Sequence, residues 1–566
     1  MPVIKDRADH SGDHSRDSHA KHFYNLTGGG LSRYSFVAGA AALLWLLLRS
    51  GTKPSRLTYP CQQAAFSAAS LSFGVPVVLF LVAMRHRLAS ILRTPVGVVL
   101  AGIALLVTIG VAGRFSAADT GTPGPILDPP PGYRAQVYHV TQCPANPVGE
   151  HFIGLDRLLT LMGREGLKFY RSPTVTPTSG PEGIISADDV IVVKINYQWP
   201  ERGGTNTDLL RGLLRRIFDH PDVFSGEVVV CENAQFNPID GFDRATNNAQ
   251  NHSLSPHDVV VGFQAQGYRV SHFDWTAIRY ASVAEYSAGN MTNGYIIYPV
   301  NPQLNGRVSY PKFQTSYGTY VSLKYGVWLP ESSTYDREHL KFVNLPVLKS
   351  HHATYGATAC VKHYMGVVTG ELNTNSHVAI GNGILGALQG EIRPADLNIL
   401  DCIWINANPN TGPQTTYSGA TRRNELVASR DPVAADIWAV KNILIPAFIA
   451  NGYGPPWPSP SADPNDPNSA FRHYLDRSMS YLLAAGDDVT NDLGQIDTFT
   501  WNGAGDLNCD GAVNFGDVNP FVLALGGQAG YQAAFPNCNW LNADCNGDGI
   551  VDFADINPFV ALLTSW

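Results

Sequence analysis

Five nitrogen-bearing side chains crowd the stretch LPVLKSHHATYGATACVKHYMG at residues 345–366, which is otherwise largely apolar or small. Lys349 and His351 are two residues apart, so both side chains project from the same face of an extended strand. Lys362 belongs to the helix predicted next, over TACVKHYM, one turn from Thr358. Amines and imidazoles together can bind a phosphate, a carboxylate or another oxyanion, and either group can serve as a general acid or base. A lysine whose pKa is lowered can also act as a nucleophile.

The elements that would hold these side chains alternate between strand and helix, which is typical of an α/β fold with a mostly parallel sheet. Strands are predicted at 190–195, 227–231, 268–273, 341–348 and 396–405. Continuous β-branched runs, such as VIVVKI in the first strand, are typical of strands buried on both faces. Between 280 and 335 the sequence becomes rich in Tyr, Asn and Gly, and we expect an antiparallel β insertion there.

Helix signals separate the predicted strands. Helices are predicted over 207–218, 255–267 and 431–445. Thr207 is the expected N-cap of the first helix, and the second begins with a Ser-Pro pair and has Gly267 as its expected C-cap. At the start of the third helix, Asp431 precedes a proline, which favours a capping role over a catalytic one.

The carboxyl ends of parallel strands form the edge at which α/β folds bind ligands. Lys194 and Asn196 end the first predicted strand with the same two-residue spacing as Lys349 and His351. We expect six side chains to converge on one cationic pocket. The candidate catalytic residues are Lys349, His351, Lys362 and Lys194, and the candidate ligand-binding residues are Asn196 and His377. In the alternative interpretation the lysines are solvated strand ends, and His352 and His363 face water or the core.

The motifs VVKIN, LPVLKSH, GATACVKHYMG, DLNILDC, NTGP and LVASRDPVAADIWA follow one another between residues 186 and 447. In this order they resemble the landmarks of domain-of-unknown-function family 362. The resemblance implies an α/β domain over 137–485, interrupted by the β insertion, and linkers are predicted on either side of it, over 114–136 and 486–505. Some relatives append an iron–sulfur ferredoxin module. This chain lacks the cysteine run of such a module, so no iron–sulfur cluster is expected.

The N-terminal part predicts a membrane anchor. After a polar, disordered tail over 1–33, residues 34–113 contain two apolar runs, 64–84 and 94–113, that are each long enough to span a bilayer as a transmembrane helix. The shorter run at 36–48 could be a third span or a signal-like segment. The arginine-rich loop RHRLASILR between the two long runs favours the cytoplasm. The later domains are therefore expected on the outer face of a bacterial cell membrane.

The C-terminal segment, 506–566, repeats a loop followed by an apolar run, because DLNCDGAVNFGDVNPFVLAL returns as DCNGDGIVDFADINPFVALL. Oxygen-bearing side chains recur at loop positions 1, 3, 5 and 12, and a glycine occupies position 6, as a hard cation and a sharp turn require. A backbone carbonyl at position 7 completes each predicted calcium site. The predicted ligands are Asp506, Asn508, Asp510, Ala512 and Asp517 for one calcium ion, and Asp544, Asn546, Asp548, Ile550 and Asp555 for the second.

This repeat resembles the type I dockerin, a pair of loop–helix units with Asp at the last ligand position. The resemblance implies a small all-α, EF-hand-like module that folds with calcium, and in cellulosomal relatives such a module docks to a cohesin. A cohesin-like or other cell-surface protein is therefore the expected partner, although NPF replaces the usual recognition residues after each loop. Cys509 and Cys538 could close a disulfide over this unit, which suits an extracytoplasmic location. Cys231 and Cys402 end apolar runs and are expected as buried thiols.

The chain of 566 residues carries a net charge of −8 and no basic stripe, which argues against a nucleic-acid-binding surface. Three functional interpretations remain. The first is an enzyme of unassigned reaction that acts on a small anion outside the cytoplasmic membrane. The second is a non-catalytic surface assembly component attached through the calcium repeats. The third, a polysaccharide-degrading enzyme, needs two carboxylates around a sugar cleft, for which Glu227, Glu232 and Glu371 are candidates.

Overall fold

The computed structural model describes residues 124–566 apart from 145, 235–240, 370–372, 456–461, 502, 511, 537, 547–549 and 565–566. The predicted polar tail and membrane helices, and residues 114–123 of the predicted linker, lie outside the described residues. Within the described part, one helical stretch, Pro432–Ala450, is long and apolar enough to cross a membrane. Its most apolar window is 67% buried inside the fold, as in the core helix of a globular domain.

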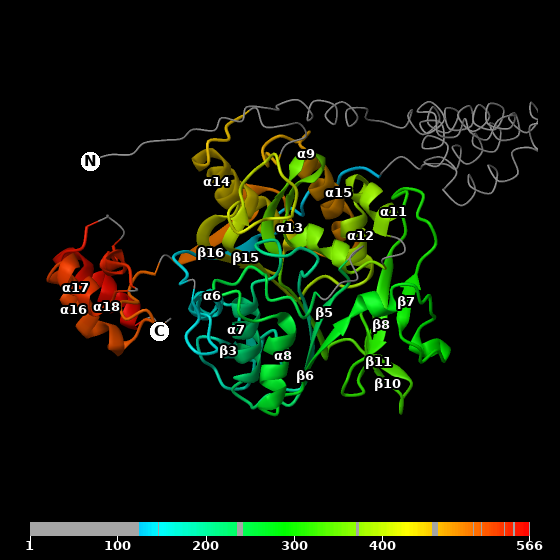
Figure 1. Ribbon diagram of the computed structural model, residues 1–566, viewed down its shortest axis with the longest axis horizontal. Coiled ribbons are helices and arrows are strands. Elements are labelled where there is room, and N and C mark those ends of the chain that lie inside the picture. Colours follow the sequence, from blue (N-terminus) through cyan, green and yellow to red (C-terminus); the bar gives the residue numbers. More distant parts are fainter. Residues whose placement is uncertain are drawn as a thin grey trace, which may run out of the picture. The chain divides into compact units, whose positions relative to one another are not determined.

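The largest element is a ten-stranded mixed sheet in the order β17-β1-β16-β15-β12-β4-β5-β6, with β13 paired to β15 and β14 (Figure 1). Its strands are β1 (Ala135–Val140), β4 (Val190–Lys194), β5 (Glu227–Glu232), β6 (Val270–Asp274), β12 (Leu340–Asn344), β13 (Val347–His351), β14 (Gly356–Thr358), β15 (Leu397–Asn406), β16 (Thr421–Ser429) and β17 (Ile496–Trp501). Neighbouring strands run parallel except where β14 or β16 is one of the pair. The predicted mostly parallel α/β sheet is therefore confirmed.

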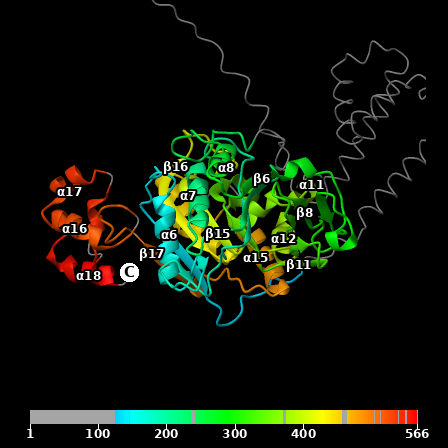
Figure 2. The same cartoon turned by 90° about the horizontal axis from the view of Figure 1, so that it is seen from below.

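Helices cover both faces of this sheet (Figures 1 and 2). One face packs against α6 (Ile153–Arg164), α7 (Thr207–Phe218) and α8 (Pro256–Ala265), and the other against α10 (Cys360–His363), α12 (Ile384–Glu391), α13 (Pro432–Ala439) and α15 (Ala470–Ala485). Successive side chains of strand β4 point to opposite faces of the sheet. Ile191 and Val193 belong to the apolar core under α6, α7 and α8, called the first core here, and Val190 and Val192 belong to the second core on the other face. Burial on both faces explains why this strand is apolar without interruption.

Shorter elements complete the domain. They are β2 (Tyr170–Arg171) paired with β3 (Ser179–Gly180), α9 (His352–Tyr355), α11 (Asn373–Val378) and α14 (Ile445–Ala450), which continues α13 through a π-helical turn at Val440–Leu444. Cys231 and Cys402 are fully buried, as predicted.

The N-cap of α7 is Asn206, not Thr207 as predicted. The Asn206 side chain accepts hydrogen bonds from the backbone N–H groups of Asp208 and Leu209. Thr207 is instead held by tertiary contacts, because its hydroxyl donates to the carbonyl oxygen of Leu254 at 3.0 Å. Both residue types can cap a helix, and packing decided between them.

The predicted N-caps Ser255 and Asp431 are present. Ser255 forms a capping box with Asp258 at the start of α8. The C-cap of α8 is Gln266, and Gly267, which was predicted as the C-cap, follows it with a left-handed φ of 91°. Asp431 accepts the N–H groups of Val433 and Ala434 at 2.8 and 2.9 Å. The capping interpretation of Asp431 is therefore confirmed.

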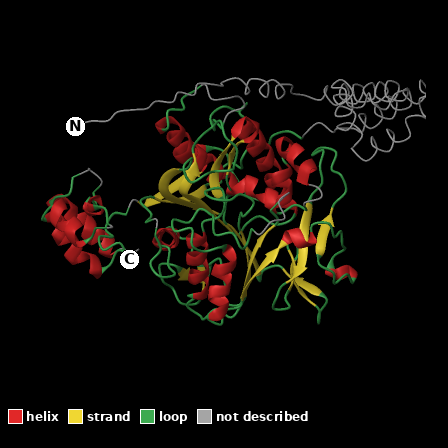
Figure 3. Cartoon of the chain, in the orientation of Figure 1, coloured by secondary structure: helices red, strands yellow, loops and turns green. Residues whose placement is uncertain are grey.

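The predicted β insertion forms a separate antiparallel sheet of five strands, visible among the yellow strands of Figure 3. Its strands, in the order β11-β10-β9-β8-β7, are β7 (Gly294–Ile297), β8 (Ser309–Gln314), β9 (Tyr320–Ser322), β10 (Gly326–Leu329) and β11 (Thr334–Asp336). Apolar residues on β7 and β8, such as Tyr295 and Phe313, belong to the second core of the main domain. The insertion is thus packed onto the α/β body.

The single strand predicted at 341–348 is two strands, β12 and β13, broken at Pro346. Proline has no N–H to donate to a ladder, and here only its carbonyl takes part, accepting from the N–H of Asp401 at 2.9 Å. The two strands lie end to end beside β15, with β12 against Leu397 and β13 against Asp401 and Asn406. The register against β15 is the same on both sides of the break and shifts only within β13, between Val347 and Lys349, so an irregularity in the pairing sets Lys349 opposite Asn406.

Residues 486–505, predicted as a linker, contain strand β17. This strand pairs in parallel with β1 over its whole length, from Ala135 opposite Ile496 to Val140 opposite Trp501. The main sheet therefore extends to Trp501.

The described residues from 506 onward carry helices α16 (Val518–Leu525), α17 (Gln528–Ala534) and α18 (Ile556–Thr564). Short 3-10 turns, Phe515–Asp517 and Phe553–Asp555, lead into the first and last of them. Phe521 and Phe559, at equivalent places in the two repeats, stack with ring centroids 4.1 Å apart. A disulfide joins Cys509 and Cys538, as the sequence led us to expect.

Candidate functional site

A cavity of about 220 Å³ lies at the carboxyl ends of the parallel strands, and all six predicted residues line it. They are Lys194, Asn196, Lys349, His351, Lys362 and His377, and the further lining residues are Gln198, Trp199, Glu232, Thr358, His363, Gly366 and Pro413. The structure thus brings together side chains that come from four regions of the sequence, around 194–199, 232, 349–377 and 413.

The place of the cavity follows from the strand order. From β4 the chain continues to β5 and then β6 on one side, whereas β12 returns to the other side of β4. Where the order reverses in this way, a crevice opens outside the carboxyl ends of the strands. Lys194 is the last residue of β4 and Glu232 the last of β5, so both reach this crevice.

Lys194 and Glu232 form a buried ion pair at the bottom of the cavity. Lys194 Nζ lies 2.5 Å from Glu232 Oε2, and the two residues are only 0% and 2% exposed. Burial lowers the pKa of Lys194 and raises that of Glu232, and the partner's charge opposes the shift in each case. Gly366 closes over the pair, because a Cβ there would lie 2.4 Å from Lys194 Nζ. The pair as a whole is neutral.

Lys349 and Lys362 bring two further buried amines to the cavity. Lys349 Nζ donates to the carbonyl oxygen of Gly203 at 2.7 Å, and Lys362 Nζ lies 4.8 Å from the centroid of the Tyr355 ring. Burial, together with the Lys362 charge, lowers the pKa of Lys349 to about 7, and burial lowers that of Lys362 to about 7. Among the described lining residues Glu232 is the one carboxylate, and it pairs with Lys194.

Two histidines of the cavity have fixed ring orientations. His351 Nδ1 lies 2.7 Å from the hydroxyl of Thr358. His363 Nδ1 lies 2.7 Å from Asn344 Oδ1, and since the Asn344 amide nitrogen donates elsewhere, Oδ1 accepts from Nδ1–H. The basic nitrogen of neutral His363 is therefore Nε2. Burial and the neighbouring lysines hold the pKa of His363 well below its ordinary value.

The remaining predicted residues are held by the backbone around them. Asn196 Oδ1 accepts from the N–H of Gln198 at 3.2 Å, and the N–H of Asn196 donates to the hydroxyl of Thr205. His377, half-buried on α11, has its carbonyl oxygen 3.2 Å from the Tyr355 hydroxyl. The side chain of His352 lies outside the described residues.

The helix that carries Lys362 starts later than predicted. Thr358 was expected one turn before Lys362 on the same helix, but it lies on β14, opposite Lys349, and α10 begins at Cys360. Asp436 on α13 fixes this start, because its carboxylate accepts the N–H groups of Cys360 and Val361 at 2.7 and 3.0 Å.

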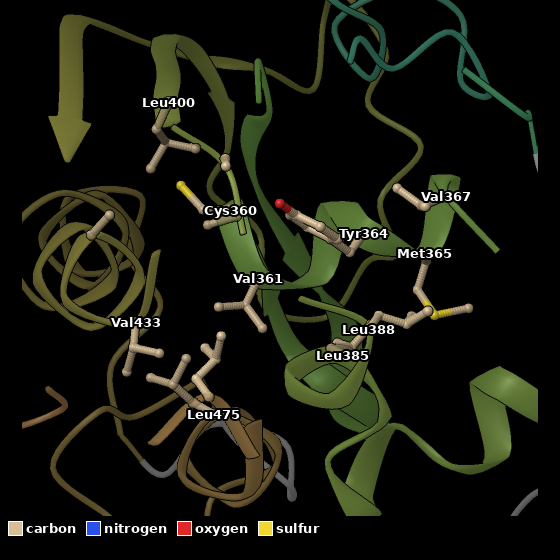
Figure 4. Packing of buried hydrophobic residues seen from close by; sticks show 14 of the residues in the cluster. Cys360, Val361, Tyr364, Met365, Val367, Leu385, Leu388, Leu400, Val433 and Leu475 are labelled. Carbon is tan, nitrogen blue, oxygen red and sulfur yellow. The ribbon is translucent and has the colours of Figure 1, made fainter. Parts of the chain in front are cut away.

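Core packing also holds α10 in place (Figure 4). Cys360, Val361 and Tyr364 point into a buried apolar cluster that includes Leu400 and Val433. Lys362 and His363, between these anchors, line the cavity instead. A short helix with one face in the core can therefore present charged groups at a buried site.

Glu232 and His363 lie in the cavity although neither was among the six candidates. Glu232 was a candidate for a sugar cleft, which needs two carboxylates. Its companion Glu227 is at the opposite end of β5, where it accepts from the Thr319 hydroxyl at 2.7 Å, and Glu371 is outside the described residues. The strand-end rule that found Lys194 applies equally to Glu232 and could have identified it.

Among the predicted calcium ligands of the first loop, Asp506 contacts a helix of the α/β domain, whereas the contacts of Asp517, Asn508 and Asp510 given below lie within the loop itself. Asp506 Oδ2 accepts from Arg157 Nη2 on α6 at 2.7 Å, in a pair that is almost fully buried. Asp517, fully buried, accepts three backbone N–H groups of its own loop at 2.7 to 3.0 Å. Asn508 donates to Asp510, and the N–H of Ala512 donates to Asp510 as well.

In the second loop Asp555 accepts the equivalent three N–H groups, from Cys545, Asn546 and Asp552. Ile550 is exposed and Asp548 lies outside the described residues. Both loops therefore bury the last carboxylate of the repeat in the same way. The donor set is made of oxygen atoms alone and suits calcium, which remains a prediction.

One group of three possible metal ligands that the sequence did not suggest lies at the amino ends of the strands. Asp188, Asp189 and His339 place one ligand atom each within 4.8 Å of one another. His339 is already hydrogen-bonded on both ring nitrogens, to Asp336 at 2.7 Å and Asp188 at 3.2 Å. We assign no ion to this group.

Comparison with known proteins gives one match. Residues 337–441 match the family described as "Domain of unknown function (DUF362)". Searches of curated proteins and of solved structures found no match. The matched segment contains Lys349, His351, Lys362 and His377, whereas Lys194 and Asn196 lie before it, although the expected resemblance began at 186. The chain therefore contains a DUF362 domain across residues 337–441.

Proposed function

We propose that the cavity binds a small anion that carries a carboxylate or phosphate group. The observation that carries this proposal is the presence of two buried amines, those of Lys349 and Lys362, in a cavity whose single described carboxylate is neutralised by Lys194. An unpaired buried cation is costly, and an anionic ligand removes that cost.

We further propose where the parts of the chain are located and what the C-terminal segment binds. Residues 34–113 anchor it in a bacterial cell membrane, and the α/β domain lies on the outer face. Residues 506–566 are a dockerin-like module that binds two calcium ions and docks to a cohesin-like or other cell-surface protein. The disulfide between Cys509 and Cys538 supports an oxidising compartment.

Oxalate tests the anion-binding proposal, because it remains a dianion across the pH range of interest and carries no reactive carbonyl. Calorimetric titration of the purified full-length chain in detergent should show one site. Lys349→Met and Lys362→Met should each weaken binding by about tenfold or more, since a charge-assisted hydrogen bond is lost. Lys441→Met, at an exposed lysine outside the cavity, is the matched control. Equal affinity in all four proteins would refute the proposal.

A second function, non-catalytic surface assembly, is favoured by one observation. Phe515 and Phe553 occupy the same position of the two loops and are 86% and 78% exposed. Large exposed aromatic side chains are common at protein-binding surfaces. Capture of a surface protein by the full-length chain with calcium, and its loss in the Phe515→Ser, Phe553→Ser double variant, would support assembly. Capture that is unchanged in the double variant would count against it.

A further inference from the structure

We propose that the cavity is also a covalent site, in which Lys349 forms an imine with the carbonyl carbon of a small oxo acid whose carboxylate is held by Lys362. This inference rests on the proposed anion binding and names its substrate class. The ligand would be a 2-oxo acid, in which the reactive carbonyl is directly bonded to the carboxylate.

The three lysines of the cavity have different partners, and the difference selects the nucleophile. Lys194 is paired with Glu232 at 2.5 Å, and the carboxylate opposes the lowering of its pKa by burial. The hydrogen-bond acceptor of Lys349 is a neutral carbonyl oxygen, that of Gly203 at 2.7 Å. A backbone carbonyl positions an amine without requiring it to be charged. With a pKa of about 7, a large share of Lys349 is the neutral, nucleophilic amine near neutral pH.

Lys362 is the group suited to hold the carboxylate. It lines the same cavity as Lys349, and its charge is one cause of the lowered pKa of Lys349. Burial lowers the pKa of Lys362 to about 7, like that of Lys349, but its amine lies against the Tyr355 ring, which favours the charged form, as a bound carboxylate does. In a 2-oxo acid the anionic group and the electrophilic carbon are adjacent, which matches two neighbouring amines with different roles. The cavity, at about 220 Å³, suits a small ligand.

The proposed step conserves atoms and charge. The lone pair of Lys349 Nζ attacks the carbonyl carbon, and the carbon–oxygen π pair moves to the oxygen, which takes up a proton to give a carbinolamine. Nζ then loses a proton, the hydroxyl gains one, and the carbon–oxygen bond breaks to release water as the nitrogen lone pair forms the C=N bond. His351 and His363 line the cavity and are the groups that could move these protons.

Reductive trapping tests the inference. The full-length chain is incubated with glyoxylate or pyruvate and sodium cyanoborohydride, and intact-mass spectrometry and peptide mapping locate the secondary amine. We expect one adduct per chain, on Lys349. Oxalate should protect against it. Lys349→Met should abolish the adduct, and Lys362→Met should slow trapping by about tenfold or more at a low concentration of oxo acid. Lys441→Met should be trapped like the parent protein, and thermal melting confirms that each variant is folded.

The outcomes separate this inference from the one on which it rests. If oxalate binds but no adduct forms, or adducts are spread over exposed lysines such as Lys441, imine formation is refuted and anion binding stands. If the adduct forms on Lys362, the assignment of Lys349 as the nucleophile is wrong. If oxalate does not bind and nothing is trapped, both proposals fail together.

Discussion

Replacement of Glu232 by Gln tests the electrostatics of the cavity without reference to any ligand. The change keeps the shape of the side chain and removes its charge, so Lys194, which is fully buried, loses the anion 2.5 Å from its amine. Lys194 then has two options. It can keep its proton as an unpaired buried cation, which costs about 3–5 kcal/mol when one partner of a buried pair is removed. It can instead lose the proton.

Loss of the proton sets an upper limit on the cost. Taking a proton from a lysine with its ordinary pKa of 10.5 costs about 5 kcal/mol at pH 7 and about 2 kcal/mol at pH 9, at 1.36 kcal/mol per pH unit. Glu232→Gln should therefore lower the free energy of unfolding by about 3–5 kcal/mol at pH 7 and by about 2 kcal/mol at pH 9. The sign follows from linkage: the pKa of Lys194 is depressed in the folded variant, so the unfolded state binds more protons and stability rises with pH.

Urea denaturation followed by tryptophan fluorescence measures these differences. Glu227→Gln, at the other end of the same strand, is the matched control and should cost about 1 kcal/mol, because it weakens one hydrogen bond and removes an ion pair with the exposed Arg269. Adding Lys194→Met to Glu232→Gln should recover most of the lost stability, since it removes the buried amine that has lost its anionic partner. A loss below about 1 kcal/mol at pH 7, or a loss that is the same at pH 9, would refute the reasoning.

Three further predictions concern the cavity and the C-terminal repeats. Oxalate affinity should be highest below pH 7 and should fall above it by up to about tenfold per pH unit for each amine, because above pH 7 Lys349 and Lys362 must take up protons to bind the anion. Calorimetry at several pH values checks this, and a flat profile would contradict it. Gly366→Ala should destabilise the protein by about 1–3 kcal/mol, since the new methyl group overlaps Lys194 and Glu232. Gly262→Ala, on α8 with open space around it, should be neutral or stabilising in the same denaturation assay. Addition of calcium at about 100 times its Kd should stabilise residues 506–566 by about 2.7 kcal/mol, and Asp517→Ala should reduce this gain. Scanning calorimetry with calcium or a chelator measures both effects. A melting profile that neither calcium nor the chelator changes would exclude calcium sites.

Local patterns predicted most of the cavity. Lys194, Lys349 and His351 follow apolar strand runs, and the end of a strand can be located from the sequence alone. In a parallel sheet these ends meet at one edge whatever the order of the strands. The convergence of the three residues could therefore be anticipated without knowledge of the topology.

The partners of these side chains could not be predicted in the same way. Glu232 faces Lys194 because β4 and β5 are adjacent, with Lys194 opposite Cys231, and adjacency depends on the order of the strands. The alternative interpretation put His363 in water or the core, whereas it lines the cavity. Strand β14 intervenes and delays the helix, and this delay changes which of its residues face the cavity.

The pairing of β1 with β17 has a consequence for the synthesis of this protein. The first strand of the main sheet acquires its outer neighbour only when residues 496–501 are available, after the rest of the domain has been made. Contacts between such distant parts of a chain form slowly, and an exposed strand edge can pair with other molecules. A nascent chain that has not reached Trp501 therefore carries an open edge that holdase chaperones could recognise. Completion of the last strand, rather than assembly of the cavity, ends this vulnerable period.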